Sequence, residues 1–336
     1  MLLCQDGSPW IMSCSGLQHL ANPLPTTSAM GNHTCPTRWL GLRKIACMVS
    51  VTAMLLCQAS ARIGKLSSQA PSTSPVSGCM ATLPDPAAAG WRLAWEDEFD
   101  GPELNATTWN VRHNESHCCP QEPQLYLQEN VQVMDGFLRL TTQRQAARGP
   151  RGLQFNWTSG WVDTKGHVAF QQGRWDVRAR LPAWNATGAW PAHWLLPEPS
   201  DVCWPTGGEI DILEAWMEPW VPATTGTLRW GTTCGNNEQV LPGGLYPPNP
   251  LNTSIQFNAG WHTFTVVWNA SALTFAVDNC VYHVQDHPDA MGVLQYPMYF
   301  IADTAISYWW NPGASAVYPA VHDIDSVRVW QPPTSA

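Results

Sequence analysis

The sequence has no apolar run that is long enough to cross a membrane as a helix. A spanning helix needs about 20 apolar residues, whereas the candidate run, Ile45 to Cys57, has 13. The sequence also lacks an internal repeat, a glycine-rich phosphate loop and a Ser-His-Asp pattern. These absences exclude solenoid proteins and phosphate-loop enzymes, and no local motif indicates a nucleophilic serine.

Positive charge is also scarce. The 336 residues carry 17 Lys and Arg against 26 Asp and Glu, which gives a formal net charge of -9 at pH 7. A surplus of negative charge repels nucleic acid and anionic membranes. We therefore expect no nucleic-acid partner and no membrane partner, and a neutral polymer stays compatible with the charge.

Residues 1–61 differ from the rest of the chain. A basic pair at 43–44 precedes the apolar run, and small residues at 59–61 follow it with the spacing that signal peptidase prefers. We interpret the segment as a secretory signal, with a signal anchor as the alternative, and expect a secreted protein. Because a long stretch lies ahead of this signal, Met30 is a more natural initiator than Met1.

Six of the 11 cysteines lie after residue 61, and an even set suits disulfides in an oxidising compartment. Their pairing cannot be derived from the sequence. A metal site at His117-Cys118-Cys119 is the alternative, but the motif lacks the ligand spacing of a zinc site. Secretion is further supported by N-glycosylation motifs, which begin at Asn105, Asn114, Asn156, Asn185, Asn252 and Asn269.

The remaining chain predicts one all-β domain. Residues 62–90 are rich in Ser, Pro and Ala and are interpreted as a linker, the folded domain is expected over 91–331, and 332–336 form a tail. Many short segments alternate apolar and polar residues between turn signals, and no long helical period is present. This pattern is typical of an antiparallel sandwich. The Pro- and Gly-rich segment 235–255 is expected to be a loop.

A short apolar strand after Gly207-Gly208 carries three carboxylates: Glu209, Asp211 and Glu214. Side chains on a strand alternate faces, so Glu209 and Asp211 share a face and Glu214 points away unless a β-bulge lies near Ile212 or Leu213. With the bulge, the three acids line one wall. An acidic outer face exposed to solvent is the alternative, but acids that interrupt an apolar core pattern favour a functional site.

Paired carboxylates have a definite use in chemistry. Retaining glycosidases need two carboxyl groups about 5 to 5.5 Å apart, one as nucleophile and one as general acid and then base. Carboxylates this close cannot both ionise cheaply, so one keeps its proton near neutral pH. Asp211 is expected to tune that proton exchange.

Aromatic residues are abundant, with 20 tryptophans, and their flat faces can stack on sugar rings or fill the core. Trp190 and Trp194 share a face of a predicted strand at 188–197, so they can form one platform beside the acids. Packing is the alternative. His193 lies between them and either bonds a sugar hydroxyl or is a satisfied structural group.

Several of these segments resemble a known family. The motif Glu-Ile-Asp-Ile-Leu-Glu at 209–214 is similar to the signature of glycoside hydrolase family sixteen, in the bulged form of its laminarinase-like endo-1,3-β-glucanases. The opening at 91–101, the Trp-Pro-Ala-x-Trp motif at 190–194 and the Trp-His-Thr-Phe strand at 261–264 resemble the family in the same order. The resemblance implies a β-jelly-roll sandwich of two antiparallel sheets with a concave glycan-binding cleft.

The resemblance also implies roles for individual residues. Glu209 would be the nucleophile, Asp211 its assisting carboxylate and Glu214 the acid/base. Asn130 would face the sugar, with a turn residue as the alternative, and Arg178 on the alternating strand 173–182 would join the cleft, with a solvated face as the alternative. The family often has His where Arg229 stands, which leaves the details of the subsites open.

The resemblance further implies retaining endo-hydrolysis of 1,3-β-glucan or mixed 1,3-1,4-β-glucan. Transglycosylation, galactan hydrolysis and a non-catalytic glucan-binding lectin on the same fold are the alternatives. We expect a polysaccharide partner, a monomer, no metal in the site and no cofactor. The family often carries a structural Ca²⁺, but no ligand cluster in the sequence indicates where it would bind.

Overall fold

The computed structural model describes residues 79–116, 122–215, 217, 223–235, 239–246, 257–307 and 312–333. The chain divides into two units, Met1–Ser74 and Pro75–Ala336, and every described residue lies in the second. The predicted signal, the alternative start at Met30, most of the predicted linker, the 117–119 motif and the last three residues lie outside the described part. Among the described residues, no helix is long and apolar enough to span a membrane.

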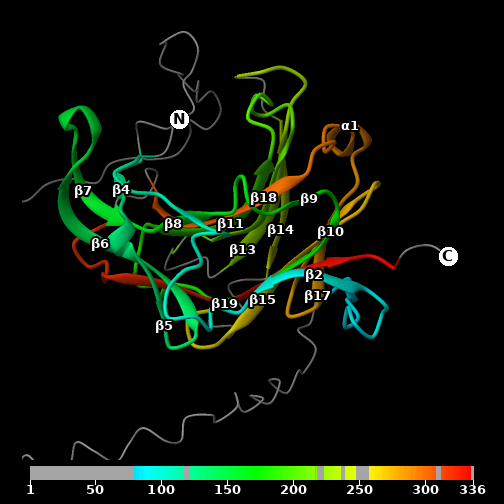
Figure 1. Ribbon diagram of the computed structural model, residues 1–336, viewed down its shortest axis with the longest axis horizontal. Coiled ribbons are helices and arrows are strands. Elements are labelled where there is room, and N and C mark those ends of the chain that lie inside the picture. The colour runs from blue at the N-terminus through cyan, green and yellow to red at the C-terminus, as the bar shows by residue number, and fades with distance from the viewer. Residues whose placement is uncertain are drawn as a thin grey trace, which may run out of the picture. The chain divides into compact units, whose positions relative to one another are not determined.

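Two β-sheets make up the described domain, and they lie one over the other as two curved layers (Figure 1). The 11-stranded sheet has the order β1 (Ala81–Thr82), β17 (Cys280–Gln285), β16 (Leu273–Val277), β15 (His262–Trp268), β10 (Gly173–Arg180), β19 (Ala320–Gln331), β6 (Phe137–Arg148), β7 (Gln154–Ser159), β4 (Gln124–Tyr126), with β2 (Arg92–Asp97) beside β19 and β5 (Val131–Met134) beside β6.

The eight-stranded sheet carries the acids. Its order is β14 (Gln239–Tyr246), β13 (Thr224–Trp230), β12 (Glu209–Ala215), β11 (Ala189–Pro197), β18 (Met298–Ile306), β8 (Trp161–Asp163), β3 (Asn110–Val111), with β9 (Ala169–Phe170) beside β18. The described helical segments are short: α1 (Pro288–Gly292) and the 3₁₀ turns η1 (Gln128–Asn130) and η2 (Pro150–Gly152). All described strand pairs are antiparallel except β4 with β7. The all-β prediction is confirmed.

Strand β14 falls in the segment that was expected to be a loop, so that expectation is wrong for 239–246. The strand lies at the edge of its sheet, where only one side must form a ladder with β13. Proline is tolerated at such an edge, and Pro242 pairs with Thr227 next to a shift in register. Turn residues within the segment therefore did not prevent strand pairing.

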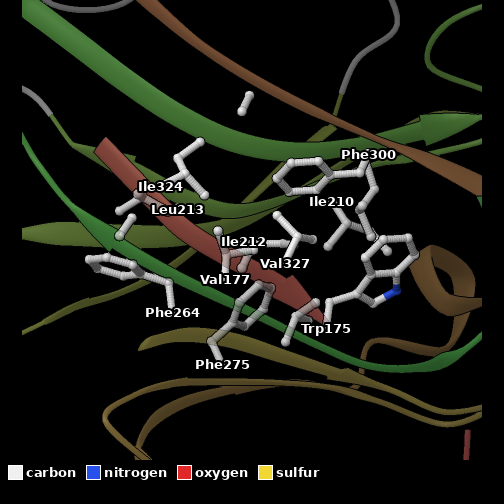
Figure 2. Packing of buried hydrophobic residues seen from close by; sticks show 14 of the residues in the cluster. Trp175, Val177, Ile210, Ile212, Leu213, Phe264, Phe275, Phe300, Ile324 and Val327 are labelled. Atoms are coloured by element: carbon white, nitrogen blue, oxygen red, sulfur yellow. The ribbon is translucent and has the colours of Figure 1, made fainter. Parts of the chain in front are cut away.

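The core fills the space between the two sheets. Figure 2 shows Trp175 and Val177 of β10 facing Ile210, Ile212 and Leu213 of β12, and all five side chains are buried. Burying each large apolar side chain contributes about 1.5 to 3 kcal/mol. We call this set of packed residues the inter-sheet core, and we call the opposite face of the eight-stranded sheet the site face.

A second, smaller apolar cluster forms around Tyr126, Trp161, Tyr299 and Ile301, with Trp194 against it. Ile301 alternates with Phe300 and Ala302, which belong to the inter-sheet core, so this cluster lies on the site face. Tyr126 comes from β4, a strand of the other sheet. One part of the site face is therefore covered by aromatic side chains.

Two disulfides link the described cysteines, Cys79 with Cys280 and Cys203 with Cys234. The first ties the segment before β1 to β17, and β1 itself pairs with β17. Residues 79–90, which were assigned to the predicted linker, therefore include part of the folded sheet. A disulfide and a strand pair hold a segment whose composition resembles that of a linker.

The Cys79–Cys280 disulfide closes a loop of 201 residues, so its removal releases much chain entropy in the unfolded state. We expect the double variant Cys79→Ser/Cys280→Ser to lose about 2 to 5 kcal/mol of unfolding free energy in non-reducing urea titrations. Because reductant also opens the Cys203–Cys234 disulfide, the matched control compares the wild type and the variant both in reductant, where their midpoints should agree. Equal urea midpoints for the oxidised wild type and the variant would contradict this assignment.

Candidate active site

Strand β12 contains the predicted bulge. Asp211 pairs with Thr227 of β13 and Glu214 pairs with Thr225, so two residues of β12 lie opposite the single residue Gly226. A shift at the same place occurs against β11. The extra residue returns Glu214 to the face of Glu209 and Asp211. The prediction that the three acids share one wall is confirmed, and we call them the acid trio.

The apolar residues of β12 explain why the strand bulges there. Ile210, Ile212 and Leu213 all belong to the inter-sheet core, although 212 and 213 are consecutive (Figure 2). A regular strand would send one of that pair to the site face. The bulge allows both to be buried, at about 1.5 to 3 kcal/mol each, and the same distortion turns Glu214 outward.

Glycines give the acid strand the room it needs. A Cβ on Gly226 would lie 2.2 Å from Cδ1 of Phe275, so a core ring occupies the space opposite the bulge. Gly208, which precedes β12, has a φ of +77° and would place a Cβ 2.4 Å from Leu294. Only glycine adopts that backbone without strain and fits against the leucine.

One arginine contacts the whole acid trio. Nε of Arg229 lies 3.3 Å from Oε1 of Glu209 and 3.2 Å from Oδ2 of Asp211, while its Nη2 lies 3.4 Å from Oε2 of Glu214. Arg229 faces Glu209 directly in the register of β12 and β13. Arg229 was not predicted as a site residue, although Arg in place of the family's usual His was the available signal.

Burial raises the pKa of Asp211 well above its usual range, and the negative charges of Glu214 and Glu209 raise it further, while Arg229 acts in the opposite direction. The Asp211 side chain is only 3% exposed, so water does little to stabilise its charge. Asp211 therefore keeps its proton at pH values at which an exposed aspartate is already ionised.

A tryptophan supports the first glutamate. Nε1 of Trp204 donates a hydrogen bond to Oε2 of Glu209 at 2.8 Å. The Cys203–Cys234 disulfide ties the loop of Trp204 to the segment after β13, and the backbone N–H of Gly235 donates to the Trp204 carbonyl at 3.1 Å. Sequence reasoning missed Trp204, since nothing local indicates that it reaches Glu209.

Trp190 and Trp194 lie on the site face of β11, as predicted, and neither is fully buried. Trp194 pairs in register with Asp211. Its Nε1 donates to Oδ1 of Asp303 at 2.9 Å, and the other oxygen of Asp303 accepts from the Tyr126 hydroxyl at 2.9 Å. The Trp194 indole beside the acids is thus bonded to Asp303, which Tyr126 bonds in turn. Sugar binding by these tryptophans stays a prediction.

The prediction that His193 binds substrate is wrong. Its side chain is fully buried in the inter-sheet core, where Nε2 lies 3.0 Å from Nε2 of His322 and the ring packs near Phe264 and Phe300. Alternation along β11 places it opposite Trp190 and Trp194. Burial and the neighbouring His322 lower the pKa of His193 well below its usual range, so the ring is neutral and structural.

The prediction for Arg178 is also wrong. Strand β10 belongs to the 11-stranded sheet, and its inward side chains are those of the core, so Arg178 lies on the far side of the sandwich from the acid trio. There it forms an ion pair with Asp325 and lies 5.5 Å from the ring centre of Trp261. Alternation identified the polar face of β10 correctly. It does not show which sheet β10 joins, because that depends on pairing with segments that are distant in the sequence.

Asn130 is buried at the end of η1, where its Nδ2 donates to the Thr141 carbonyl at 2.7 Å. No contact among the described residues joins it to the acid trio, and its binding role stays a prediction.

No group of three or more His, Cys, Asp or Glu side chains in the described part of the chain is arranged to hold a metal. The calcium expectation therefore gains no ligand set.

The fold and this strand arrangement match known proteins. Residues 122–326 match the family described as glycosyl hydrolases family 16. The chain is a member of this family.

Two curated relatives of this family 16 protein are glucanases by name. It is 29% identical over 281 residues to glucan endo-1,3-beta-glucosidase A1 of Niallia circulans, covering 74% of this chain but only 39% of that protein. It is 32% identical over 203 residues to glucan endo-1,3-beta-glucosidase of Cryptopygus antarcticus, covering 59% of this chain and 71% of the other.

A solved structure shares the fold. The endo-beta-1,3-glucanase of Pyrococcus furiosus superimposes with a TM-score of 0.63 at 29% identity, covering 72% of this chain and 94% of that one. The jelly-roll sandwich implied by the sequence resemblance is thereby confirmed. This family 16 chain differs from the expected pattern at Arg229, which the geometry places against all three acids.

Because Phe275 fills the space beside Gly226, we expect Gly226→Ala to lower the unfolding free energy by about 1 to 3 kcal/mol and to displace the bulge. Thermal unfolding would measure the first effect. Gly292→Ala is the matched control, since a Cβ there meets open space and the variant should match the wild type. Equal unfolding temperatures for the two variants would show that the bulge tolerates a side chain at 226.

The raised pKa of Asp211 makes stability depend on pH. In the unfolded chain an aspartate ionises near pH 4, whereas the folded chain keeps the Asp211 proton to higher pH. The folded state then binds more protons, so the unfolding free energy falls as pH rises above about 4, by about 1.4 kcal/mol for each unit of raised pKa. We expect Asp211→Asn to lose less stability than the wild type between pH 4 and pH 8.

Urea titrations at several pH values would measure this slope. Asp135→Asn, at the exposed turn between β5 and β6, controls for the loss of one carboxyl group. If the slope of Asp211→Asn equals that of the wild type, the Asp211 proton does not contribute to stability in this range.

Proposed function

We propose that the chain is a retaining endo-glycosidase that hydrolyses 1,3-β-glucan or mixed 1,3-1,4-β-glucan through a covalent glycosyl-enzyme. The observation that carries the proposal is the bulged strand β12, which brings Glu209, Asp211 and Glu214 together on one face. A retaining glycosidase needs a nucleophilic carboxylate and a second carboxyl group that gives and takes a proton. The endo-1,3-glucanase names of the relatives support the substrate class.

Glu209 suits the role of nucleophile. It is the most accessible of the three acids, with a side chain 14% exposed against 3% for Asp211 and 6% for Glu214. The Trp204 N–H and the Arg229 guanidinium both favour its ionised form. An ionised carboxylate attacks the anomeric carbon, forming the glycosyl-enzyme as the glycosidic bond breaks.

Glu214 is then the acid and base. Its proton goes to the leaving oxygen in the first step, and it takes a proton from the attacking water in the second, which releases the sugar and restores Glu209. Asp211 lies between the two glutamates along the strand and keeps its own proton, so it can donate a hydrogen bond to a neighbouring carboxylate without adding negative charge. Trp190 and Trp194 provide apolar faces for sugar rings beside these groups.

We also propose that the chain acts alone and in an oxidising compartment, as a secreted protein whose partner is the polysaccharide itself. The two disulfides support this compartment, because such bonds persist in secreted proteins and are reduced in the cytosol. A glucan-binding lectin is disfavoured, because binding alone does not require three carboxyl groups that converge on one face and repel one another.

Glu209→Gln keeps the size of the nucleophile but removes its charge, so we expect the rate of laminarin hydrolysis to fall at least about 10³-fold while laminarin binding persists. Reducing-sugar release and titration calorimetry would measure the two effects. Glu103→Gln, at an exposed position, is the matched control and should retain full activity. Undiminished hydrolysis by Glu209→Gln would refute the assignment of the nucleophile.

The same assay identifies the substrate and the outcome of the second step. Laminarin, lichenan, agarose and carrageenan would be compared with the wild type, and NMR of the first-formed product would show whether the anomeric configuration is retained. Chain-length analysis with added acceptor sugar would detect transglycosylation as products longer than the substrate. Cleavage of agarose or carrageenan in place of laminarin would overturn the glucan assignment.

A further inference from the structure

Arg229 contacts three carboxyl groups, whereas an ordinary ion pair joins one cation to one anion. Its guanidinium lies within 3.4 Å of one oxygen of each member of the acid trio. The group cannot lose its charge in a protein, so a fixed positive charge sits among three groups that share protons. Because the guanidinium is planar, its nitrogens point in fixed directions. Nε faces Glu209 and Asp211, and Nη2 faces Glu214.

The surroundings make this charge effective. The Arg229 side chain is 25% exposed, while its three partners are nearly buried, so the attraction is screened less than in a surface pair. The register of β13 with β12 places Arg229 opposite Glu209, and the next strand outward, β14, carries no Asp, Glu, Lys, Arg or His. On the other side of the trio, β11 contributes Trp194, and β18 contributes Asp303, which is bound by Trp194 and Tyr126. Strand β18 also contributes Tyr299, whose pKa is raised by burial and, to a smaller extent, by nearby charges that include Glu209.

We propose that Arg229 is a positioning residue of the reaction: it lets Glu209 stay ionised beside two further carboxyl groups and holds Glu214 in its place for proton transfer. The inference rests on the proposed glycosidase function and assigns the charge balance of that same site. Three carboxyl groups with no cation would take up a further proton at neutral pH, and the nucleophile would be lost. A neutral imidazole at this position would not provide the same fixed charge.

The proposal predicts a change in pH dependence as well as a change in rate. Removing the positive charge raises the pKa of the nucleophile, so the acidic limb of the activity profile moves to higher pH by about one pH unit or more. We expect Arg229→Met and Arg229→Gln to show this displacement and to lose at least about tenfold in kcat at pH 6, with little change in KM. Arg229→Lys keeps the charge and should keep the acidic limb where it is, with part of the rate recovered.

The experiment measures kcat and KM for laminarin from pH 4 to pH 9 for the wild type and these three variants. Arg328→Met is the matched control, because Arg328 contacts two carboxylates, Glu96 at 3.3 Å and Glu98 at 2.6 Å, on the other sheet. It should leave the profile unchanged. Neutral variants that lose rate equally at every pH, or a lysine variant whose acidic limb moves as theirs does, would overturn the proposal.

A second measurement needs no substrate. Without Arg229 the folded trio binds protons over a wider pH range than the unfolded chain, so Arg229→Gln should lose more thermal stability than the wild type between pH 4 and pH 8. Equal losses would also overturn the proposal. A wild type that cleaves none of the four polysaccharides would refute the proposed function, whereas this unfolding comparison would still test the charge balance around Arg229.

Discussion

One extra residue in strand β12 links the packing of this protein to its chemistry. A sandwich needs the strand to bury Ile210, Ile212 and Leu213, and a retaining site needs Glu209, Asp211 and Glu214 on the opposite face. A regular strand cannot satisfy both demands, because its side chains alternate strictly. The bulge satisfies both, and Gly226 with Phe275 behind it makes the bulge possible. Core packing therefore determines where the acids point.

The acid trio is costly to fold, since three carboxyl groups lose water and repel one another. The structure offsets the cost in two ways: Asp211 keeps a proton, and Arg229 contacts all three groups. Each arrangement also serves the proposed reaction, since it leaves Glu209 ionised. The interactions that make the folded site tolerable therefore bear directly on the proposed chemistry of the trio.

Local patterns predicted much of this structure, and the two wrong residue predictions have different causes. The all-β class and the shared face of Trp190 and Trp194 follow from a period of two along single strands, whereas the bulge was inferred because the three acids can share a face only if the strand departs from that period. Alternation alone also places His193 on the opposite face of β11 from Trp190 and Trp194. The wrong prediction that His193 binds substrate therefore came from giving the residue type more weight than the strand geometry. Arg178 was assigned to the wrong sheet, because the neighbours of a strand are set by distant segments.

The two site residues that the sequence did not predict, Arg229 and Trp204, reach the acids through strand pairing and through a loop, not through strand alternation. Arg229 reaches the trio through the β12–β13 register, and Trp204 reaches Glu209 through a loop tied down by the Cys203–Cys234 disulfide. Neither contact has a local signature, although Arg229 did stand out as a departure from the family pattern. Supporting groups of this kind become visible only when the strand pairing and the disulfides are known.

The support of the acids is distributed around them, and this arrangement explains why the site face is partly covered. Tyr126 arrives from β4 of the other sheet, bonds Asp303 and packs at 5.2 Å against Trp161, which in turn packs at 5.2 Å against Trp194. The indole beside the acids is therefore fixed by a chain of contacts that crosses between sheets. In the proposed role as a sugar platform beside Glu209, an indole that could tilt would lose precision, so the buried aromatic cluster would serve orientation as well as stability.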